Sequence, residues 1–337
     1  MKRLEKIAFV LRKEETDFLE LTEAIDDYEA LVFELSNISI AEESNRRDIH
    51  FVNGKALGTT WAALCIRDIL RTKTFIKGLF NAIDYVKETK EGPVHVIYAG
   101  TGPFATLILP IMATYPEEKV QFTLLEINKV SFESTNRVIN KLGFDRYIKG
   151  MVNEDATKYV VNPDDQIDIL VSETMQRALE REQQVPIVMN IMRQLKADSI
   201  LIPEKITLDL CLMNMTKFQA GLMNTEEESC IIKLGHIFEL SREKIIAYYL
   251  ANQTDNRQLR FPRLSFDLPI EQMDEFNQLV ILTEIQVFGE DRIGFNESGL
   301  TTPLILEDLS GQQEELTVNI RYCVNEDPGI EYQLIQE

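Results

Sequence analysis

The chain has 337 residues, 45% of them hydrophobic and 27% charged, which is the composition of a globular protein large enough for two domains. Its formal net charge of −20 at pH 7 repels nucleic acid and anionic membrane surfaces, so the sequence predicts neither as a partner. We interpret most of this charge as serving solubility, although it would also attract a cationic partner.

Residues 1–90 are expected to form an N-terminal helical region. Apolar residues recur there at helical spacing with acids between them, at Leu11, Phe18, Leu21, Ile25, Tyr28 and Val32. The dipeptide Asn53-Gly54 predicts a turn, and 61–86 predicts one or two amphipathic helices. We expect the apolar faces of these helices to pack on the segment that follows.

Residues 91–203 alternate between strand and helix patterns, which indicates an α/β, Rossmann-like parallel sheet with helices on both faces. We expect strands over 94–99, 120–125, 148–152, 167–172 and 199–202, and helices over 104–115, 131–142 and 187–195. The stretch 94–115 carries no charged residue and is long enough to span a bilayer. Its glycines and prolines favour a buried strand, a turn and a buried helix instead.

Residues 204–337 are expected to form a mostly antiparallel, barrel-like β domain. Strand patterns occur over 207–213, 281–288, 302–306, 316–322 and 331–335, with a helix expected over 238–249. The stretch 214–265 is interpreted as an insertion, and it contains the apolar residues Phe238, Leu240, Ile245, Ile246 and Tyr249. These side chains are suited either to an interface or to the core of the domain.

The cysteines and histidines give no metal-ligand spacing. The four cysteines are far apart and form no CxxC pair, and the chain has only three histidines. We therefore expect no metal site. Isolated cysteines in a chain of this size are typical of reduced, buried residues, which favours a cytoplasmic protein.

A glycine turn follows the first expected strand of the sheet. Gly100-Thr101-Gly102 would let the backbone approach a ligand closely, and the expected helix after it would attract negative charge. The same residues also satisfy the dinucleotide pattern G-x-G-x-x-A, with Glu126 where a ribose-binding acid is expected. A nicotinamide cofactor and a purely structural turn are therefore both open at this point.

Three further strand ends favour S-adenosylmethionine. Glu126 ends the second strand, where a carboxylate can accept from both ribose hydroxyls. Glu154-Asp155-Ala156 follows the third strand, where an acid can meet an adenine amino group. Ser172 and Glu173 end the fourth strand at the same edge of the sheet, where open α/β sheets bind ligands. Each acid alone could be a helix cap or a solvated charge, but their joint occurrence favours a cofactor site.

With these residues in place, the chain resembles the protein arginine methyltransferases over roughly 60–320. Two of the four similar stretches are fairly specific. Asp68-Ile-Leu-Arg71-Thr72-Lys-Thr-Phe75 resembles the family's D-x-x-R-T-x-x-Y helix, and 172–182 resembles its double-glutamate loop, with Glu173 and Glu182 nine positions apart. The other two are the glycine loop with Glu126 and the strand leading to Pro203.

The resemblance implies a fold, a cofactor and a set of site residues. It implies that Arg71 holds the carboxylate of S-adenosylmethionine and that its helical segment acts as a lid. It implies that Glu173 and Glu182 are catalytic and grip a cationic nitrogen substrate. The implied cofactor-binding residues are Arg71, Tyr98, Gly100, Thr101, Gly102, Glu126, Glu154, Asp155, Ala156 and Ser172. A homodimer formed through an arm within 214–265 is also implied.

The sequence departs from the family pattern at three places. Tyr98 stands where the family usually has an acid, and Phe104 replaces a glycine. The Thr-His-Trp loop of the family is missing, and 294–303 occupies the matching place. The methyl acceptor, a guanidino or amino nitrogen of a peptide or a small molecule, is therefore left open. A NAD-dependent oxidoreductase and a non-catalytic S-adenosylmethionine-binding interaction module stay as alternatives.

Overall fold

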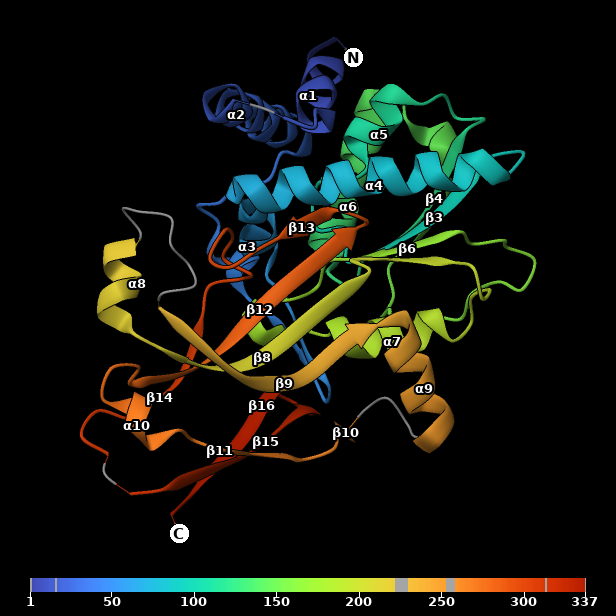
Figure 1. Ribbon diagram of the computed structural model, residues 1–337. Coiled ribbons are helices and arrows are strands. Elements are labelled where there is room, and N and C mark those ends of the chain that lie inside the picture. The colour runs from blue at the N-terminus through green and yellow to red at the C-terminus, as the bar shows by residue number, and fades with distance from the viewer. Residues whose placement is uncertain (1, 16, 222–229, 253–257, 313, 337) are drawn as a thin grey trace.

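The computed structural model describes residues 2–15, 17–221, 230–252, 258–312 and 314–336. Figure 1 shows three parts in chain order: N-terminal helices, a parallel sheet with its helices, and a β domain. The long helix α4 (Ile69–Thr89) runs between α1 and α2 on one side and strands of the β domain on the other, so it joins the three parts (Figure 1).

The N-terminal region begins with two packed helices, α1 (Lys2–Arg12) and α2 (Phe18–Ser36). The carboxylate of Asp17 caps α2 by accepting hydrogen bonds from the backbone N–H groups of Leu19 and Glu20. The buried hydroxyl of Tyr28 donates to the carbonyl oxygen of Thr106, at 2.5 Å. Helix α2 therefore supports the segment that follows the glycine turn.

The expected turn at Asn53-Gly54 is confirmed as the bend of a small hairpin, β1 (Ile49–Phe51) and β2 (Gly54–Ala56). The stretch 61–86 forms two helices, α3 (Thr59–Leu64) and α4, joined by a 3-10 turn over Cys65–Arg67. Another 3-10 turn, Glu43–Arg46, precedes the hairpin.

The parallel sheet has the strand order β5-β4-β3-β6-β7, and every neighbouring pair is parallel. Its strands are β3 (Val94–Ala99), β4 (Val120–Leu125), β5 (Ile148–Val152), β6 (Ile169–Ser172) and β7 (Ile200–Ile202). All six residues of β3 are buried, because this central strand is covered on both faces. The connecting helices include α5 (Leu109–Thr114), α6 (Lys129–Leu142) and α7 (Gln184–Met192). The predicted α/β fold is confirmed.

The helix expected over 104–115 begins later than the sequence indicated. Gly102 and Ala105 have positive φ values of 60° and 52°, which interrupt helical geometry. Helix α5 begins at Leu109 with Pro110 in its first turn, a position that proline favours. The glycine turn is therefore followed by irregular backbone rather than by a helix N-terminus.

The β domain consists of two antiparallel sheets. One has the order β13-β12-β8-β9, with β14 also paired to β12, and the other has β10-β15-β11, with β16 paired to β15. The strands are β8 (Lys205–Met213), β9 (Ile231–Ser241), β10 (Leu259–Arg260), β11 (Leu264–Asp267), β12 (Gln278–Phe288), β13 (Asp291–Ile293), β14 (Leu304–Asp308), β15 (Leu316–Val324) and β16 (Gly329–Gln336). Between the sheets, Phe238 stacks on Tyr322 and meets Phe261 edge-on.

The helix expected over 238–249 is wrong in its first turn. Residues up to Ser241 belong to β9 and pair with β8, for example Phe238 with Leu208, and helix α9 (Arg242–Asn252) begins only after them. Phe238, Leu240 and Ile245 are buried in the core of the chain itself. Of the stretch 214–265, helix α8 (Met215–Gly221) and the outer side of α9, with Leu250 69% exposed, lie at the surface.

The β domain packs tightly on α4. The position of Gly78 has no room for a side chain, because an added Cβ would lie 2.5 Å from Cγ1 of Val287 on β12. One turn further along the helix, the side-chain amide of Asn81 donates to the carboxylate of Asp291 on β13, at 2.7 Å. A short helix, α10 (Ile270–Met273), completes the domain.

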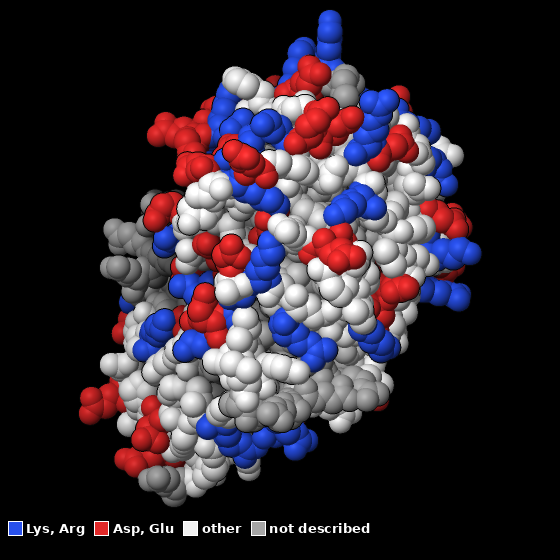
Figure 2. All heavy atoms as spheres, turned by 90° about the vertical axis from the view of Figure 1, so that its right-hand side faces the viewer, with Lys and Arg blue, Asp and Glu red and all other residues white. Residues whose placement is uncertain are grey.

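The surface and the cysteines add three observations. On the face drawn in Figure 2, Lys and Arg side chains are interspersed with Asp and Glu, without one sign covering the face. Among the described helices, none is long and apolar enough to cross a membrane. The four cysteines form no disulfide.

Candidate functional site

A pocket lies along the carboxyl edge of the parallel sheet. It takes in the ends of four neighbouring strands, in the order β5, β4, β3 and β6, with α3 and the start of α4 on the other side. Ligands bind at this edge in open α/β sheets, because the strand ends and their loops form a crevice there. The lining includes Arg71, Tyr98, Gly100, Thr101, Gly102, Glu126, Glu154, Ala156, Glu173 and Glu182, which are ten of the twelve residues predicted from the sequence.

The glycine turn lines the pocket. Gly100 has a φ of +78°, and a Cβ there would lie 2.1 Å from Cγ2 of Thr174. Gly102 has a φ of +60° and meets only the methyl group of Ala62 at 3.7 Å. Glycine is needed at both positions for this backbone conformation, and at Gly100 also for the close approach of the loop after β6.

Glu126 is held rigidly at the end of β4. Its carboxylate accepts from the backbone N–H of Gly102 and from that of Asn128, both at 2.8 Å. The side chain is 7% exposed. Burial raises the pKa of Glu126 to about 7, against the backbone hydrogen bonds, which lower it. The remaining lone pairs of its two oxygens are available to hydroxyl donors of a ligand.

Arg71 and Glu173 form an ion pair inside the pocket. Asp68 caps α4 by accepting from the backbone N–H of Arg71, and Nε of Arg71 donates to the carboxylate of Glu173. Burial opposes the charge on Arg71, but the Glu173 carboxylate more than offsets this and the pKa of the guanidinium is raised. The pair places a cation and an anion at the junction of α4 and β6.

The loop that carries Glu173 and Glu182 has a strained backbone. Ala178, Leu179 and Arg181 all have positive φ values, of 53°, 54° and 65°, which non-glycine residues rarely adopt. Such conformations persist only where the surroundings enforce them. Because three of the four residues before Glu182 are affected, the direction of its side chain depends on this strain.

The β domain supplies the contacts that enforce the loop. The N–H of Ala178 donates to the hydroxyl of Thr283 at 2.9 Å, and the hydroxyl of Tyr322 donates to the carbonyl of Leu179 at 2.8 Å. The N–H of Arg181 donates to the carbonyl of Pro328 at 2.7 Å. The β domain therefore shapes the pocket indirectly, although none of its described residues lines it.

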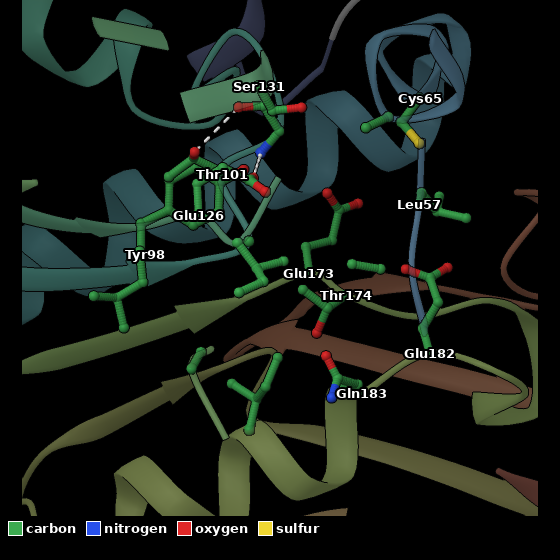
Figure 3. A pocket seen from close by; sticks show the side chains of 18 of the residues that line it. Leu57, Cys65, Tyr98, Thr101, Glu126, Ser131, Glu173, Thr174, Glu182 and Gln183 are labelled. Carbon is green, nitrogen blue, oxygen red and sulfur yellow. Dashed lines mark hydrogen bonds between the residues drawn. The ribbon is translucent and has the colours of Figure 1, made fainter. Parts of the chain in front are cut away.

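Glu182 ends the loop as a buried acid, 6% exposed, and its Oε1 atom has no hydrogen-bond partner. Burial raises the pKa of Glu182 to about 7, although the positive charge of Arg71 opposes the shift. An unpartnered buried carboxylate oxygen is costly unless a ligand or a proton satisfies it. Figure 3 shows Leu57 and Cys65 beside Glu182 at one end of the pocket, and Tyr98 and Glu126 towards the other.

Two of the predicted cofactor-binding residues do not line the pocket. Ser172 is fully buried and donates to the side-chain oxygen of Gln184, at 3.0 Å. Asp155 accepts hydrogen bonds from the backbone and hydroxyl of Thr157 and pairs with Lys158. Both residues hold the loops in place beside the pocket.

Other lining residues were not predicted from the sequence. They are chiefly Lys55, Leu57, Cys65, Thr174 and Gln183. Thr174 lies within the 172–182 loop but was not singled out there, and Lys55, Leu57, Cys65 and Gln183 belong to none of the motifs that the sequence offered. Gln184 was also missed: its side-chain oxygen accepts from the N–H and hydroxyl of Thr174, which fixes the start of the glutamate loop.

The segment 294–303, which stands in place of the Thr-His-Trp loop, lies against the start of α4. The hydroxyl of Ser298 and the N–H of Gly299 donate to the carboxylate of Asp68, at 2.6 and 3.0 Å. No residue of this segment lines the pocket. It steadies the helix that carries Arg71.

Comparisons with solved structures give the fold a context. Neither a family model nor a curated protein matches the chain. One matching structure is the "Trypanosoma brucei PRMT1 enzyme-prozyme heterotetrameric complex with AdoHcy", with a TM-score of 0.53 and 13% identity over 81% of this chain and 92% of that one. This chain has a PRMT fold.

Two PRMT6 structures agree with that result. One has a TM-score of 0.52 and 12% identity, over 80% of this chain and 97% of that one. The other, "PRMT6-SAH", has a TM-score of 0.51 and 12% identity, over 81% and 98%. At this identity the likeness shows the fold alone, so the chemistry must be argued from the pocket.

Proposed function

We propose that this chain is an S-adenosylmethionine-dependent methyltransferase that acts on a cationic guanidino or amino nitrogen. The observation that carries the proposal is the order of groups along one pocket. Glu154, Glu126 and the glycine turn follow one another across the sheet, and Glu173 and Glu182 lie beyond them. The PRMT fold supports the same assignment.

The pocket residues fit the parts of the cofactor. We assign Glu154 to the adenine amino group and Glu126 to the ribose hydroxyls, because both line the pocket at neighbouring strand ends. The missing side chain of Gly102 leaves room for the methionine chain of the cofactor, and Arg71 can take the carboxylate of that chain. When bound, S-adenosylmethionine supplies a methyl group on a positively charged sulfur, and this sulfur is a good leaving group. The protein must then align the acceptor and exclude water.

Two carboxylates make the acceptor end selective for a cation. A guanidinium stays protonated in proteins, so its weak nucleophilicity is the obstacle to transfer. Glu173 and Glu182 can hold such a group by charged hydrogen bonds and draw its positive charge towards the nitrogens that they contact. A remaining nitrogen keeps its electron pair for the methyl group. The unpartnered Oε1 of Glu182 supports this role.

The decisive test is binding and turnover by the purified chain. Calorimetry should show binding of S-adenosylhomocysteine and no binding of NAD, and labelled S-adenosylmethionine should transfer its methyl group to cationic acceptors. Glu182→Gln should abolish transfer and spare S-adenosylhomocysteine binding. Binding of NAD alone would favour the oxidoreductase alternative. Cofactor binding with no turnover on any acceptor would favour a non-catalytic module.

We also propose that the chain self-associates through the outer surfaces of α8 and α9. Of the apolar residues in 214–265, Leu250 is exposed, whereas Phe238, Leu240 and Ile245 are buried in the chain's own core. The PRMT1 match is a heterotetrameric complex. Light scattering at micromolar concentration should give the mass of a dimer, and Leu250→Glu should reduce it to that of a monomer.

A further inference from the structure

The acceptor end of the pocket is closed by the β1–β2 hairpin. We define this end by Lys55, Leu57, Cys65, Glu182 and Gln183. In Figure 3, Leu57, Cys65 and Glu182 lie on the side of Glu173 away from Glu126. Glu182 and Gln183 are 6% and 4% exposed, and Lys55 has a side-chain exposure of 16%. At the opposite end, Glu154 is exposed. The pocket therefore opens on the cofactor side and is covered where the acceptor would lie.

The hairpin is attached to the glutamate loop by direct contacts. The backbone N–H of Lys55 donates to the carbonyl of Arg181 at 2.8 Å, and Lys55 pairs with Glu182 as an isolated β-bridge. The amide of Gln183 donates to the side-chain oxygen of Asn53 at 2.7 Å, and both residues are buried. At Gly54 the two segments lie so close that a Cβ would come within 2.9 Å of the Arg181 carbonyl oxygen.

The ammonium group of Lys55 acts on Glu182 only through its charge, because its ion-pair partner is another acid. The group lies 2.7 Å from the carboxylate of Asp48, which also accepts from the backbone N–H of Gly58. Lys55 is thereby held as part of the wall, and Oε1 of Glu182 keeps no hydrogen-bond partner. The acceptor end is thus a buried anionic site, with space for a cation and a wall of hydrogen-bonded backbone.

The lining of the pocket limits the acceptor further, because every described lining residue belongs to the N-terminal region or to the parallel sheet with its helices and loops. No described residue of the β domain extends the lining into a groove that could hold a polypeptide.

Resting on the proposed function, we infer that the methyl acceptor is a small free molecule with a guanidino or amino group, not a side chain within a polypeptide. A small cation can lie beside Glu182 and be enclosed by the wall that the hairpin forms. An arginine or lysine residue within a chain would carry backbone on both sides, which would have to pass through the hydrogen-bonded contact between 53–55 and 181–183.

The test uses the full-length protein and compares the same guanidino or amino group in a free amino acid and in a residue embedded in a peptide. Free L-arginine and L-lysine are compared with N-acetylated, C-amidated tripeptides that hold each residue in the centre. Methyl transfer from labelled S-adenosylmethionine and calorimetric binding to the chain saturated with S-adenosylhomocysteine are both measured. We expect at least one free compound to bind and react more than about tenfold better than its tripeptide, because the site discriminates by size. A tripeptide that binds or reacts within that factor of the free compound overturns the inference and leaves the proposed function standing.

Failure of the proposed function has a different outcome. If S-adenosylhomocysteine does not bind, the proposed function fails and the inference fails with it; if it binds and neither form of either residue binds or reacts, the inference fails alone. The hairpin is tested by Asn53→Ala, which removes the bond to Gln183, with Val52→Ala as a matched control because the Val52 side chain is 48% exposed. Asn53→Ala should narrow the difference in binding and methyl transfer between free and embedded acceptors, and Val52→Ala should not. An equal difference in both variants would contradict the assignment of the hairpin as the wall.

Discussion

The guanidinium of Arg71 donates a hydrogen bond to the carboxylate of Glu173, and their side chains are 11% and 12% exposed. In the proposed function these two groups have different partners, because Arg71 takes the cofactor carboxylate and Glu173 takes the cationic acceptor. The cofactor carboxylate would therefore compete with Glu173 for Arg71. Once released, Glu173 can hold a cation, so the pair links the two binding events.

The first prediction concerns Glu173→Gln. Removing the charge that competes for Arg71 should leave S-adenosylhomocysteine affinity unchanged or raise it by up to roughly tenfold, while methyl transfer is lost. Calorimetry and a labelled-methyl assay measure the two effects. The control ligand is 5′-methylthioadenosine, which has no carboxylate and whose affinity should not change. A tenfold loss of S-adenosylhomocysteine affinity would show that Glu173 supports the cofactor instead of competing for its partner.

The second prediction concerns Arg71→Ala. Losing charged hydrogen bonds to the cofactor carboxylate should weaken S-adenosylhomocysteine binding by about 1.5–3 kcal/mol. Binding of 5′-methylthioadenosine should change little, which separates a lost contact from a damaged fold. Circular dichroism of the variant provides a second control. If both ligands bind Arg71→Ala as they bind the parent, Arg71 serves only as a partner for Glu173 and the start of α4 is not a lid over the cofactor.

The third prediction concerns Glu126. Glu126→Ala should weaken binding of adenosine-containing ligands by about 1–3 kcal/mol, because a buried acceptor for the ribose hydroxyls is removed. The loss should be similar for S-adenosylhomocysteine and 5′-methylthioadenosine, unlike that of Arg71→Ala. A ligand with a 2′-deoxyribose should already bind the parent chain without part of this energy. Glu126→Ala should therefore weaken its binding less than it weakens binding of the ribose ligand. Equal losses for the ribose and deoxyribose ligands would place Glu126 away from the 2′-hydroxyl.

The fourth prediction is a pH dependence caused by Glu182. Its pKa is about 7 in the folded chain, against an ordinary value of 4.5. Between these values the folded chain keeps a proton that the unfolded chain has lost. The resulting stabilisation is complete below pH 4.5 and is lost as the pH rises through 7. Glu182→Gln should therefore flatten the decline of thermal stability across this window.

The same protonation links pH to acceptor binding. A cation favours the carboxylate, so its binding near pH 6 should release about one proton, and the release should vanish near pH 9. Calorimetry in two buffers of different ionisation enthalpy measures it. Because the pKa of Glu126 is also about 7, the chain is first saturated with S-adenosylhomocysteine. Unchanged proton release in Glu182→Gln would assign the proton to another group.

The fifth prediction concerns the close approach of Gly100 and Thr174. Gly100→Ala adds a methyl group 2.1 Å from Cγ2 of Thr174 at a φ of +78°, and it should destabilise the fold by about 1–3 kcal/mol. Thr174→Ser removes the obstructing methyl group but keeps the hydroxyl that bonds Gln184. In urea unfolding, the double variant should regain the free energy of unfolding that Gly100→Ala loses to the clash with Thr174. It should not regain the part that is lost because alanine disfavours a positive φ. Simple addition of the two single effects would contradict this contact.

The sequence alone was enough to predict the parallel sheet and the edge of the sheet at which a ligand would bind. Strand patterns separated by helices predict a parallel sheet, and the carboxyl ends of parallel strands meet at one edge. For that reason Gly100, Glu126, Glu154 and Glu173 could be placed together before any contact was known. Local sequence was less informative where the backbone departs from regular geometry, as at Ala105, whose positive φ delays α5 to Leu109.

Only the tertiary structure decided what surrounds Glu182. Three non-glycine residues before it take positive φ values because Thr283, Tyr322 and Pro328 hold the loop from the β domain. The hairpin around Gly54 then closes over it from the N-terminal region. These partners lie far from Glu182 in the sequence, and no periodicity or motif connects them. The nine-residue spacing from Glu173 brought Glu182 under consideration, but its burial and its raised pKa arise from packing between three separate parts of the chain.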